Sequence, residues 1–514
     1  MMKSNKKANI VIVGSGAAGI SLALSLKNYK GEVLLIEGGK EDYSDDSQSL
    51  YEGDILRRDL PSGLVGSRSR FFGGSTNCWA GGLGVFDKID FEYRDWIKNS
   101  GWPIFFEDLE PYYKRAARFL DIDYKTINNL GKEKWLNFSG FEYRNLIFTK
   151  KTNFKTIFRK DLEKQKNLEI IFSMNLVQLH RGNSRINIAS FENYSGDQLD
   201  VQADIFVLAL GGIENARALL LTAKKDNYQD AIGNHSNHLG RYFSDHPIAP
   251  CATFVPLKGK KIKLDINEIE VSSGPGFRPF YKFPDVLQKK YKTLNSCLQF
   301  QSQELPLGDA ENSAWTIKQY ITNRSNRTPS IKDVSNVLMN PLTILKKYLQ
   351  RTGTIDRKSR LAVRFQVEQA PISGNRVILS NDVDSLGLRK VALDFDFTDI
   401  ERHTVDVAVS FLASRIYDEK IGILKYDQSL IDTLSEKLMP KDLRGGQHHS
   451  GTTKMSLMAE GGVVDKNLSV WHYPNLFILG GSCFPSNGWV NPTFTIIAMA
   501  MRLSDHLETQ VKNL

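Results

Sequence analysis

The stretch that decides the fold is NIVIVGSGAAGISLALSLKNYKGEVLLIEGG, residues 9–39. Its first part, residues 9–13, is a short β-branched run that predicts a buried strand, and a glycine-rich loop follows it. Residues 18–26 have the composition of a helix, and residues 32–36 predict a second strand. Together these segments form a β-α-β unit of about 30 residues, the length that such a unit requires.

The loop of this unit matches the dinucleotide-binding pattern G-x-G-x-x-G. It consists of Gly14, Ser15, Gly16, Ala17, Ala18 and Gly19. In this pattern the first glycine permits a tight turn, the second lets the backbone approach a pyrophosphate, and the third lets helix and strand pack closely. Glu37, followed by Gly38, ends the second strand, where a carboxylate accepts hydrogen bonds from the ribose hydroxyls of an adenosine. The sequence therefore predicts a dinucleotide site rather than a structural turn, and the loop alone does not separate FAD from NAD.

Two later segments have the pattern of parallel strands that end in paired glycines. Residues 205–210 precede Gly211 and residues 476–479 precede Gly480, and a helix-like stretch follows each pair. One nucleotide-binding domain therefore draws on the start, the middle and the end of the chain. We predict an α/β fold in which a Rossmann-like domain is assembled from discontinuous segments.

The middle of the chain predicts a second domain. Alternating stretches such as RVILS, residues 376–380, and KVALDFDF, residues 390–397, favour antiparallel strands with one solvated face. We assign residues 251–439 to an α+β domain that faces the substrate and is built on a mainly antiparallel sheet. Residues 1–250 and 440–514 then form the cofactor-binding domain.

Composition and charge limit the kinds of molecule that the protein is expected to bind. The chain has 514 residues, and its 67 basic and 58 acidic residues give a net charge of +9. We interpret this charge as spread along the chain, which disfavours nucleic acid as a partner. The four cysteines lie far apart, which favours reduced thiols and a cytoplasmic location. They are Cys78, Cys251, Cys297 and Cys483.

The sequence also bears on membranes. No stretch approaches the ~20 apolar residues of a spanning helix, so we expect a soluble protein, or at most one bound to a membrane surface. The basic segment 318–360 includes SNVLMNPLTILKKYLQR, residues 335–351. This run is compatible with an amphipathic helix against a membrane or partner, and an ordinary solvated helix over the core is the simpler interpretation.

A second glycine cluster, FFGGSTNCWAGG, occupies residues 71–82. Its glycines, hydroxyls and single tryptophan suit a backbone that lies against a flat ring, and a surface loop anchored by the tryptophan is the alternative. At this point the sequence resembles the glucose-methanol-choline (GMC) oxidoreductases, whose flavin is covered by such a loop. The resemblance extends to ALGGIENARALL from Ala209, GNHSNHLGRYFSDHP from Gly233 and residues 445–501.

The resemblance implies FAD as the cofactor, covered by a loop near residues 66–84. The further residues that it implies around FAD, beyond the first glycine loop and its acidic residue, are Gly73, Gly74, Ser75, Asn77, Cys78, Trp79, Ala80, Val177, Gly211, Gly481, Ser482, Asn491, Pro492 and Thr493. In several sugar-oxidising members, a histidine that bonds covalently to the flavin stands where this chain has Cys78. We therefore expect non-covalent FAD and a small buried thiol at Cys78, with a cysteinyl link as the less favoured alternative.

Oxidation of an alcohol by a flavin requires a base with a pKa near neutrality, because the hydroxyl proton must leave while hydride leaves the carbon. The run QHHSGTTKM from Gln447 resembles the family's H-x-x-G-T signature, which implies His448 as the base and has His449 pointing elsewhere. A buried structural histidine is the alternative. Asn491, just before the last helix, is implied as the partner of the substrate oxygen, and an N-cap of that helix is its structural interpretation.

The ending NPTFT has Asn491 where glucose-oxidase-like members have a second histidine, so it is most similar to the branch of pyranose oxidases and sugar or sugar-acid dehydrogenases. The resemblance implies hydride transfer from a CH–OH group of a sugar or sugar derivative to flavin N5, with oxygen, a quinone or a redox protein as electron acceptor. A steroid or other alcohol oxidase, a non-redox FAD-containing hydroxynitrile-type lyase and a non-catalytic flavoprotein subunit are the alternatives. No metal is expected at His235, His238, Asp245 and His246, because GRYFSDHP, residues 240–247, fits the family's G-x-x-x-x-D-H-P loop.

Overall fold

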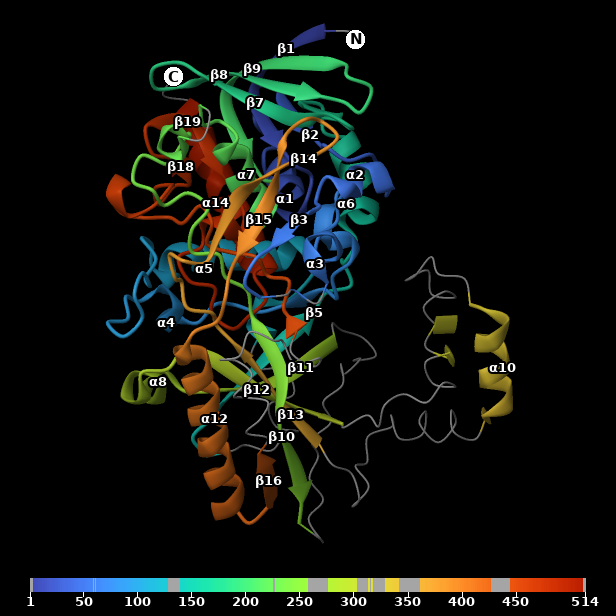
Figure 1. Cartoon of the computed structure of the whole chain (residues 1–514), viewed down its shortest axis with the longest axis vertical. Helices are drawn as coiled ribbons and strands as arrows, with labels where there is room; N and C mark the ends of the chain where they lie inside the picture. The colour runs from blue at the N-terminus through green and yellow to red at the C-terminus, as the bar shows by residue number, and fades with distance from the viewer. Residues whose placement is uncertain are drawn as a thin grey trace.

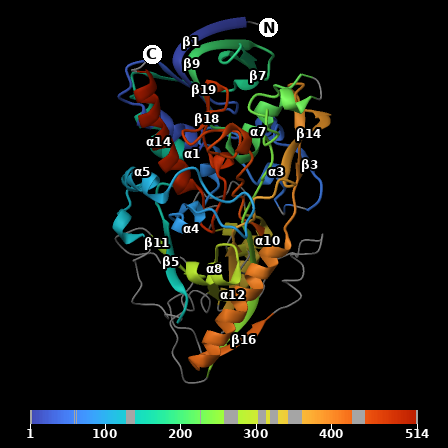
Figure 2. The same ribbon diagram turned by 90° about the vertical axis from the view of Figure 1, so that its left-hand side faces the viewer.

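The computed structural model describes residues 3–58, 60, 62–127, 139–224, 227–257, 276–302, 313–314, 316–317, 329–341, 361–426 and 444–511. It has a mainly parallel sheet at one end and an antiparallel sheet at the other, and both chain termini lie at the end of the parallel sheet (Figure 1 and Figure 2). Of the basic segment 318–360, only residues 329–341 are described.

The parallel sheet has eight strands with hydrophobic runs at its centre. In order across the main path they are β18 (Ser469–Val470), β19 (Tyr473–Ile478), β9 (Gln198–Leu208), β1 (Lys3–Val13), β2 (Val33–Ile36) and β6 (Leu168–Ile171). β7 (Asn175–Arg181) and β8 (Ile186–Glu192) extend the sheet through β9. β19, β9, β1, β2 and β6 run parallel, so their carboxyl ends meet at one edge, where such sheets bind ligands.

Helices cover this sheet. α1 (Ala17–Ser25) follows β1 directly and packs against the last helix, α14 (Thr493–Val511), which in turn packs against α5 (Phe106–Phe119). α6 (Phe154–Glu163) contacts α1, and α7 (Gly211–Leu220) follows β9. Because α1 and α7 each begin directly after a parallel strand, their N-termini lie at the carboxyl edge of the sheet.

The antiparallel sheet forms the other end of the molecule. Its order is β16 (Gly422–Tyr426), β10 (Pro247–Pro256), β13 (Leu361–Val367), β12 (Ser296–Ser302), β11 (Gly276–Lys282), β5 (Glu142–Phe148) and β4 (Gly82–Leu83), with β17 (Arg444–Gly445) beside β10. α12 (Asp399–Asp418) packs on β10, β12, β13 and β16 through an apolar stripe at helical spacing. That stripe contains Val405, Ala408, Val409, Leu412 and Ile416. The predicted α/β fold with a mainly antiparallel second sheet is confirmed.

Strand pairing crosses the predicted domain boundaries. β4 and β5 precede residue 251, but they join the antiparallel sheet. The predicted strands RVILS and KVALDFDF form the hairpin β14 (Arg376–Val383) and β15 (Arg389–Asp394), which pairs with β3 (Gly53–Ile55) in a separate three-stranded sheet and contacts α7. The division into residues 1–250 with 440–514 and residues 251–439 therefore stays a prediction.

The other described elements are short. The helices are α2 (Asp45–Ser49), α3 (Gly63–Gly66), α4 (Lys88–Phe91), α8 (Asp285–Tyr291) and α10 (Ile331–Met339). The 3₁₀ turns are η1 (Gly74–Asn77), η2 (Tyr124–Thr126), η4 (Tyr228–Asp230), η5 (Ala459–Gly461) and η6 (Gly481–Cys483). None of the described helices combines the length and the apolar composition that crossing a bilayer requires.

Candidate active site

A cavity of about 520 Å³ is lined both by loops at the carboxyl edge of the parallel sheet and by strands of the antiparallel sheet. Most of the predicted site residues line it. They are Gly14, Ser15, Gly16, Ala17, Ala18, Glu37, Gly38, Gly74, Ser75, Cys78, Trp79, Ala80, Gly211, His448, Gly481, Asn491, Pro492 and Thr493. The predicted residues that are not among its lining are Gly19, Gly73, Asn77, Val177 and Ser482.

The first glycine loop has the geometry that its pattern predicts. Gly14 has a φ of +101°, which favours glycine, and a Cβ there would lie 2.7 Å from the Ala209 carbonyl oxygen. A Cβ at Gly19 would lie 1.9 Å from the Gly14 carbonyl oxygen, so α1 packs on the turn only because Gly19 has no side chain. A Cβ at Gly16 would meet no atom within 4 Å. That open side lies at the N-terminus of α1, where backbone N–H groups suit a phosphate.

Glu37 follows β2 and is buried, and its carboxylate already accepts three hydrogen bonds. Oε2 accepts from the backbone N–H and the hydroxyl of Ser15, at 2.9 and 2.6 Å, and Oε1 accepts from the backbone N–H of Gly39 at 2.7 Å. These bonds tie the end of the strand to the glycine loop. Because Glu37 also lines the cavity, its remaining lone pairs are the ones that a ribose would meet.

The second glycine loop lies directly against the first. The Gly73 N–H donates to the Ser15 carbonyl oxygen at 3.1 Å, and a Cβ at Gly74 would lie 2.9 Å from the Cα of Gly16. Gly73 and Gly74 both have positive φ, +95° and +52°, so the turn requires glycine at both positions. The two glycine-rich motifs of the sequence therefore form one continuous wall of the cavity.

The end of this loop lines the cavity. The Trp79 indole N–H donates to the Thr152 carbonyl oxygen and so holds the ring in place. Cys78 is exposed, and its thiol accepts a hydrogen bond from the Ser69 hydroxyl at 3.3 Å. The expectation of a buried thiol at Cys78 is therefore wrong, because η1 ends at Asn77 and leaves the next side chain on the cavity wall rather than in the core.

His448 is in contact with a second histidine. The Nδ1 atoms of His448 and His246 are 2.8 Å apart, so one of them donates and the other accepts. His246 Nε2 lies 3.2 Å from the Asn487 carbonyl oxygen, which can only accept, so this nitrogen carries a proton. Burial lowers the pKa of His246 to about 4, so its ring is neutral and its Nδ1 is an acceptor. His448 therefore carries its proton on Nδ1, and Nε2 of His448 is left to accept one.

One buried carboxylate ties the two histidine segments together. Asp245 accepts hydrogen bonds from the backbone N–H groups of His246, Gln447 and His448, at 2.7, 3.1 and 2.8 Å. Burial raises the pKa of Asp245 to about 6, although these N–H groups pull it down. Burial, and then the neighbouring His246 and His449, hold the pKa of His448 well below 6.5. His448 is therefore unprotonated at neutral pH, with a pKa below the near-neutral value expected for the base.

His449 forms another part of the wall. Its ring packs on Phe243, with the ring centres 5.5 Å apart, and burial lowers its pKa to about 3. Among the described residues its buried Nε2 has no hydrogen-bond partner, and the residue lines the cavity. A buried polar atom of this kind is one that a bound group would satisfy, which the sequence motif did not reveal.

Asn491 lies two residues before the start of α14. Its side-chain nitrogen donates to the Gly82 carbonyl oxygen at 3.2 Å, which links the start of the last helix to β4. Asn491, Pro492 and Thr493 line the cavity at the N-terminus of α14. Free N–H groups and the helix dipole favour negative charge at this point.

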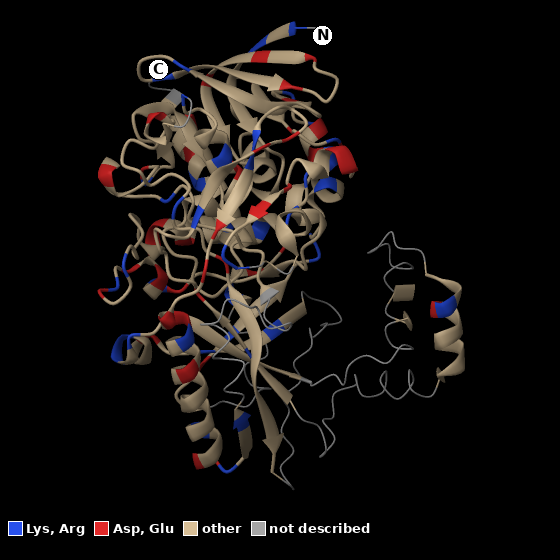
Figure 3. Ribbon diagram, in the orientation of Figure 1, with Lys and Arg blue, Asp and Glu red and all other residues tan. Residues whose placement is uncertain are grey.

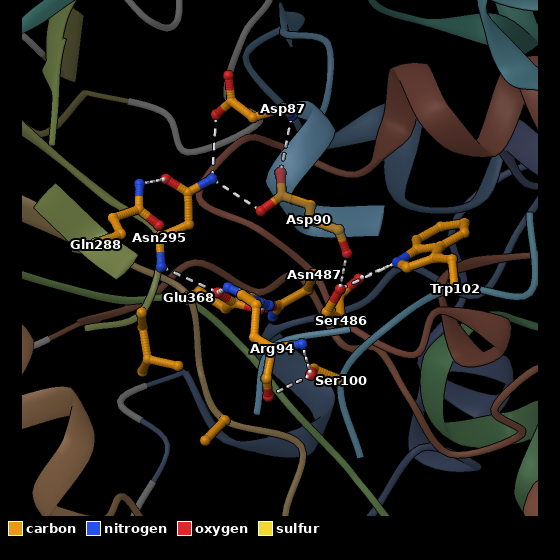
Figure 4. A network of polar contacts seen from close by, with 12 residues as sticks. Asp87, Asp90, Arg94, Ser100, Trp102, Gln288, Asn295, Glu368, Ser486 and Asn487 are labelled. Atoms are coloured by element: carbon orange, nitrogen blue, oxygen red, sulfur yellow. Dashed lines mark hydrogen bonds and ion pairs between the residues drawn. The ribbon is translucent and has the colours of Figure 1, made fainter. Parts of the chain in front are cut away.

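A buried polar network holds the loop that leads to Asn491 (Figure 4). The Ser486 hydroxyl donates to the Asp90 carbonyl oxygen at 2.6 Å. The Trp489 indole N–H donates to the Asp87 carboxylate at 2.9 Å. Burial, and then the nearby Asp87, raise the pKa of Asp90 well above its ordinary value, so a proton is held more tightly in this network than in water.

An ion pair completes the network from the side of the antiparallel sheet. Arg94 donates to both oxygens of Glu368, at 2.7 and 2.6 Å, and the two side chains are 1% and 0% exposed. Glu368 also accepts from the backbone N–H of Asn295 at 3.1 Å. The Gln366 side chain donates to the Trp489 carbonyl oxygen. The loop before α14 is therefore held by Gln366 of β13 and by Asp87 and Asp90 at α4.

The antiparallel sheet presents one face of alternating side chains to the cavity. The lining residues on its strands include Leu146, Phe148, Ile248, Arg278, Phe280, Gln299, Arg364 and Gln366. The register pairs Gln299 with Arg364 and Ile248 with Gln366. Sequence reasoning missed these residues, because alternation along a strand tells which residues share a face but not what that face meets.

The other histidines of the GNHSNHLGRYFSDHP run lie elsewhere. His235 packs edge-on against His472, with ring centres 4.4 Å apart. His238 forms hydrogen bonds with the Tyr242 hydroxyl at 2.8 Å and the Glu460 carbonyl oxygen at 2.7 Å. Within the part of the chain that the structure describes, no three His, Cys, Asp or Glu side chains gather as a metal site requires.

Part of the chain matches a family of known proteins. Residues 371–500 match the family model described as GMC oxidoreductase. In this C-terminal region the chain is similar to the GMC oxidoreductases, as its sequence motifs implied. A 2-methyl-1,2-propanediol dehydrogenase of Mycolicibacterium austroafricanum is 21% identical over 100% of this chain and 97% of its own length. The fructose dehydrogenase large subunit of Gluconobacter japonicus is 25% identical over 64% of this chain and 52% of its own. A C-glycoside 3-oxidase of Microbacterium trichothecenolyticum is 28% identical over 27% of this chain and 25% of its own.

The fold is also found in solved structures. A formate oxidase of Aspergillus oryzae RIB40 superimposes with a TM-score of 0.57 at 15% identity, over 99% of both chains. The predictions of the GMC family, of its FAD-binding α/β fold, of FAD as the cofactor of that family and of an oxidoreductase acting on CH–OH groups are confirmed.

Proposed function

We propose that this GMC oxidoreductase oxidises a CH–OH group of a sugar or sugar derivative, with His448 as the base. The observation that carries the proposal is the contact between His448 and His246, which leaves Nε2 of His448 as a proton acceptor in a residue that lines the cavity. A neutral imidazole held in one tautomer is the form that takes a hydroxyl proton. Bound FAD would supply the hydride acceptor, N5 of its ring.

The residues of the cavity fit FAD. The open side of Gly16 at the N-terminus of α1 suits the pyrophosphate, and the Glu37 carboxylate suits the adenosine ribose. Residues 73–80 would cover the ring, because Gly74 already lies against Gly16. We propose non-covalent binding, since position 78 carries a cysteine instead of the linking histidine of related enzymes.

Asn491 is the proposed partner of the substrate oxygen. The Gly82 carbonyl oxygen takes one N–H of its amide, at 3.2 Å, and so fixes the orientation of the side chain. The amide has a second N–H, which would donate to the oxygen of the reacting CH–OH group. In this arrangement the amide holds the substrate oxygen while Nε2 of His448 takes its proton.

The lining favours a sugar over a sterol. Arg278, Gln299, Arg364 and Gln366 all line the cavity, and a wall with several amide and guanidinium groups suits a substrate with many hydroxyl groups better than an apolar one. Two relatives are named for sugar substrates, the C-glycoside 3-oxidase and the fructose dehydrogenase large subunit. We also propose a cytoplasmic location, because all four cysteines are free thiols.

The test follows the visible absorbance of the flavin without oxygen while sugars, sugar acids, polyols and sterols are added to the purified protein. We expect a sugar or sugar acid to bleach the flavin, and His448→Ala to slow the bleaching by about 10²- to 10⁴-fold. The matched control is His403→Ala, an exposed histidine on α12, which should bleach as the natural protein does. Bleaching by sterols alone would exclude the sugar class, and turnover of a cyanohydrin without bleaching would favour the lyase.

A further inference from the structure

The wall that the antiparallel sheet contributes to the cavity carries two arginines. Arg278 stands on β11 and Arg364 on β13, with β12 between the two strands. The register pairs Arg364 with Gln299 of β12, and Arg278 with Leu146 of β5. All four residues line the cavity, so both guanidinium groups belong to the face that a substrate would meet.

Arg278 lies close to the residues that we assign to catalysis. Its guanidinium carbon is 5.0 Å from the centre of the Phe148 ring. A Cβ at Gly82 would lie 3.3 Å from Phe148 and 3.2 Å from the Asn491 side-chain nitrogen. One aromatic ring therefore separates Arg278 from Asn491, and a substrate that reached Asn491 would also reach Arg278.

The carboxylates of the cavity lie away from the strands that carry Arg278 and Arg364. The carboxylates among the described lining residues are Glu37, Glu214 and Asp384. Each of them is already bound within the protein, Glu214 and Asp384 by arginines at 2.6 Å. Among the described lining residues on β11 and β13, the charged side chains are Arg278 and Arg364.

We propose that the substrate carries an anionic group, the carboxylate of a sugar acid or a related hydroxy acid, which Arg278 and Arg364 bind. A planar guanidinium matches a carboxylate with two parallel hydrogen bonds, and the partly closed cavity strengthens the attraction. The inference rests on the proposed function, because His448 and Asn491 define where the reacting carbon lies.

Matched pairs of compounds test this substrate class, such as glucuronate with glucose, gluconate with glucitol and glycerate with glycerol. We expect the acid of a reactive pair to reduce the flavin with a kcat/KM at least tenfold above that of its neutral partner. Arg278→Gln and Arg364→Gln should each raise KM for the acid by about 10- to 100-fold and raise KM for the neutral partner by a smaller factor, so that the acid loses its advantage. Arg402→Gln, on the outer side of α12, is the control and should change neither.

A second measurement reads the anion site without turnover. Acetate and inorganic phosphate are titrated against the visible spectrum of the bound flavin, and we expect a saturable change that the double variant Arg278→Gln/Arg364→Gln loses. Equal reactivity of acid and neutral partners, or an unaltered titration in the double variant, overturns the anionic substrate and leaves the proposed function standing. A normal titration without reduction by any CH–OH compound overturns the proposed function and leaves the anion site.

A separate observation concerns α10, which lies apart from both sheets (Figure 1). Its polar side is turned toward another segment, since the Ser313 hydroxyl donates to Asp333 at 2.9 Å and accepts from Asn336 at 3.1 Å. Its apolar side is exposed. The exposed side chains are Ile331, Val334, Leu338 and Met339, at 91, 45, 73 and 80%. They form one apolar stripe along the helix. A helix that packs on a core buries such a stripe, whereas this one is exposed.

The same part of the sequence carries nearly all of the net charge. Of the 67 basic and 58 acidic residues, ten basic and two acidic ones lie in residues 318–360, which leaves 57 and 56 in the rest of the chain. Over the two sheets, basic and acidic residues are interspersed along the ribbon (Figure 3). The net charge is therefore concentrated around α10 in the sequence rather than spread along the chain.

We infer that α10 binds the surface of a membrane that contains anionic lipid. An amphipathic helix with basic residues around it places its apolar stripe among the acyl chains and its cations near the headgroups. Nucleic acid would suit the basic residues of this segment but not the apolar stripe. A second copy of the chain would cover the apolar stripe but would not suit the basic residues.

Sedimentation of the holoenzyme with vesicles tests this surface, using phosphatidylcholine alone or mixed with phosphatidylglycerol. We expect binding to the mixed vesicles only, weakened by salt, and at least a tenfold loss of affinity in Leu338→Glu/Met339→Glu with the FAD content unchanged. The control is Leu457→Glu/Met458→Glu, an apolar pair that is also exposed, at 73 and 67%, and should bind as the natural protein does. Equal binding to both vesicles, equal loss in the control, or a change of oligomeric state in place of vesicle binding overturns the inference.

Discussion

A histidine acts as a base only when one ring nitrogen is free to accept a proton and the ring is unprotonated at working pH. His448 meets both conditions through its neighbours. His246 accepts the hydrogen bond from Nδ1 of His448, and burial lowers the pKa of both rings. Asp245 fixes the backbone of both residues, so the two rings are held as one unit.

This burial predicts a fold that weakens in acid. His246 and His449 have pKa values of about 4 and about 3 in the fold, below the ordinary 6.5, so the unfolded chain binds more protons as the pH falls from 6.5. Their contribution to stability is present above 6.5 and is lost below it, by about 2 kcal/mol per ring near pH 5. Asp245, with its pKa raised to about 6, acts in the opposite direction and offsets about 1 kcal/mol.

Chemical denaturation at neutral pH and at about pH 5 measures this effect. In His449→Phe, the free energy of unfolding should fall by about 2 kcal/mol less between the two conditions than it does in the natural protein. An identical fall in both proteins would mean that His449 is not held neutral by burial.

Substitution by alanine should have different effects at two glycines of the first loop. In Gly16→Ala the new methyl group meets no atom within 4 Å, so the fold should lose no more than about 1 kcal/mol while FAD binds at least tenfold more weakly. In Gly19→Ala the methyl group would lie 1.9 Å from the Gly14 carbonyl oxygen, so the fold itself should lose about 3 kcal/mol or more. Thermal unfolding and FAD titration of both variants separate the cases, and a Gly16→Ala protein that binds FAD normally would contradict the assigned pyrophosphate position.

At the scale of elements, the loop before α14 depends on the buried pair of Arg94 and Glu368. Glu368→Gln would leave Arg94 buried without its counter-ion, at a cost of about 3–5 kcal/mol. The variant should also lower kcat more than it raises KM, because the loop that leads to Asn491 loses one support. Glu107→Gln breaks the exposed pair with Lys88 and should change the free energy of unfolding far less than Glu368→Gln in a denaturation experiment. Equal costs in the two variants would argue against a buried charge network.

Local sequence patterns predicted the helix and strands of the first β-α-β unit well. The predicted helix 18–26 and strand 32–36 differ from α1 and β2 by one residue at each affected end. The strand predicted at residues 9–13 begins earlier, at Lys3, because its first residues pair with β9 while their side chains stay largely exposed. An apolar run marks only the buried part of such a strand.

At the scale of the whole molecule, contacts between residues far apart in the chain determine the features that local sequence patterns did not predict. The β14–β15 hairpin was predicted as antiparallel strands, but its partner β3 lies more than 300 positions earlier in the chain. His246 and His448 are likewise 202 positions apart, so the motif predicted the base without its partner. Motifs identify residues whose own spacing is fixed, whereas the wall with Arg278 and Arg364 depends on which face of a sheet meets the cavity.

The cavity joins the start, the middle and the end of the chain, so its cofactor should stabilise the entire fold. At a free FAD concentration of about 100 times Kd, linkage predicts about 2.7 kcal/mol of added stability, seen as a rise in the unfolding temperature of the apoprotein. NAD shares the adenosine and pyrophosphate that the first glycine loop would hold, but it lacks the ring that residues 73–80 would cover. We therefore expect a smaller rise with NAD than with FAD, and a smaller rise with either in Gly16→Ala than in the natural protein. Equal rises with FAD and NAD would mean that the second glycine loop contributes no binding energy.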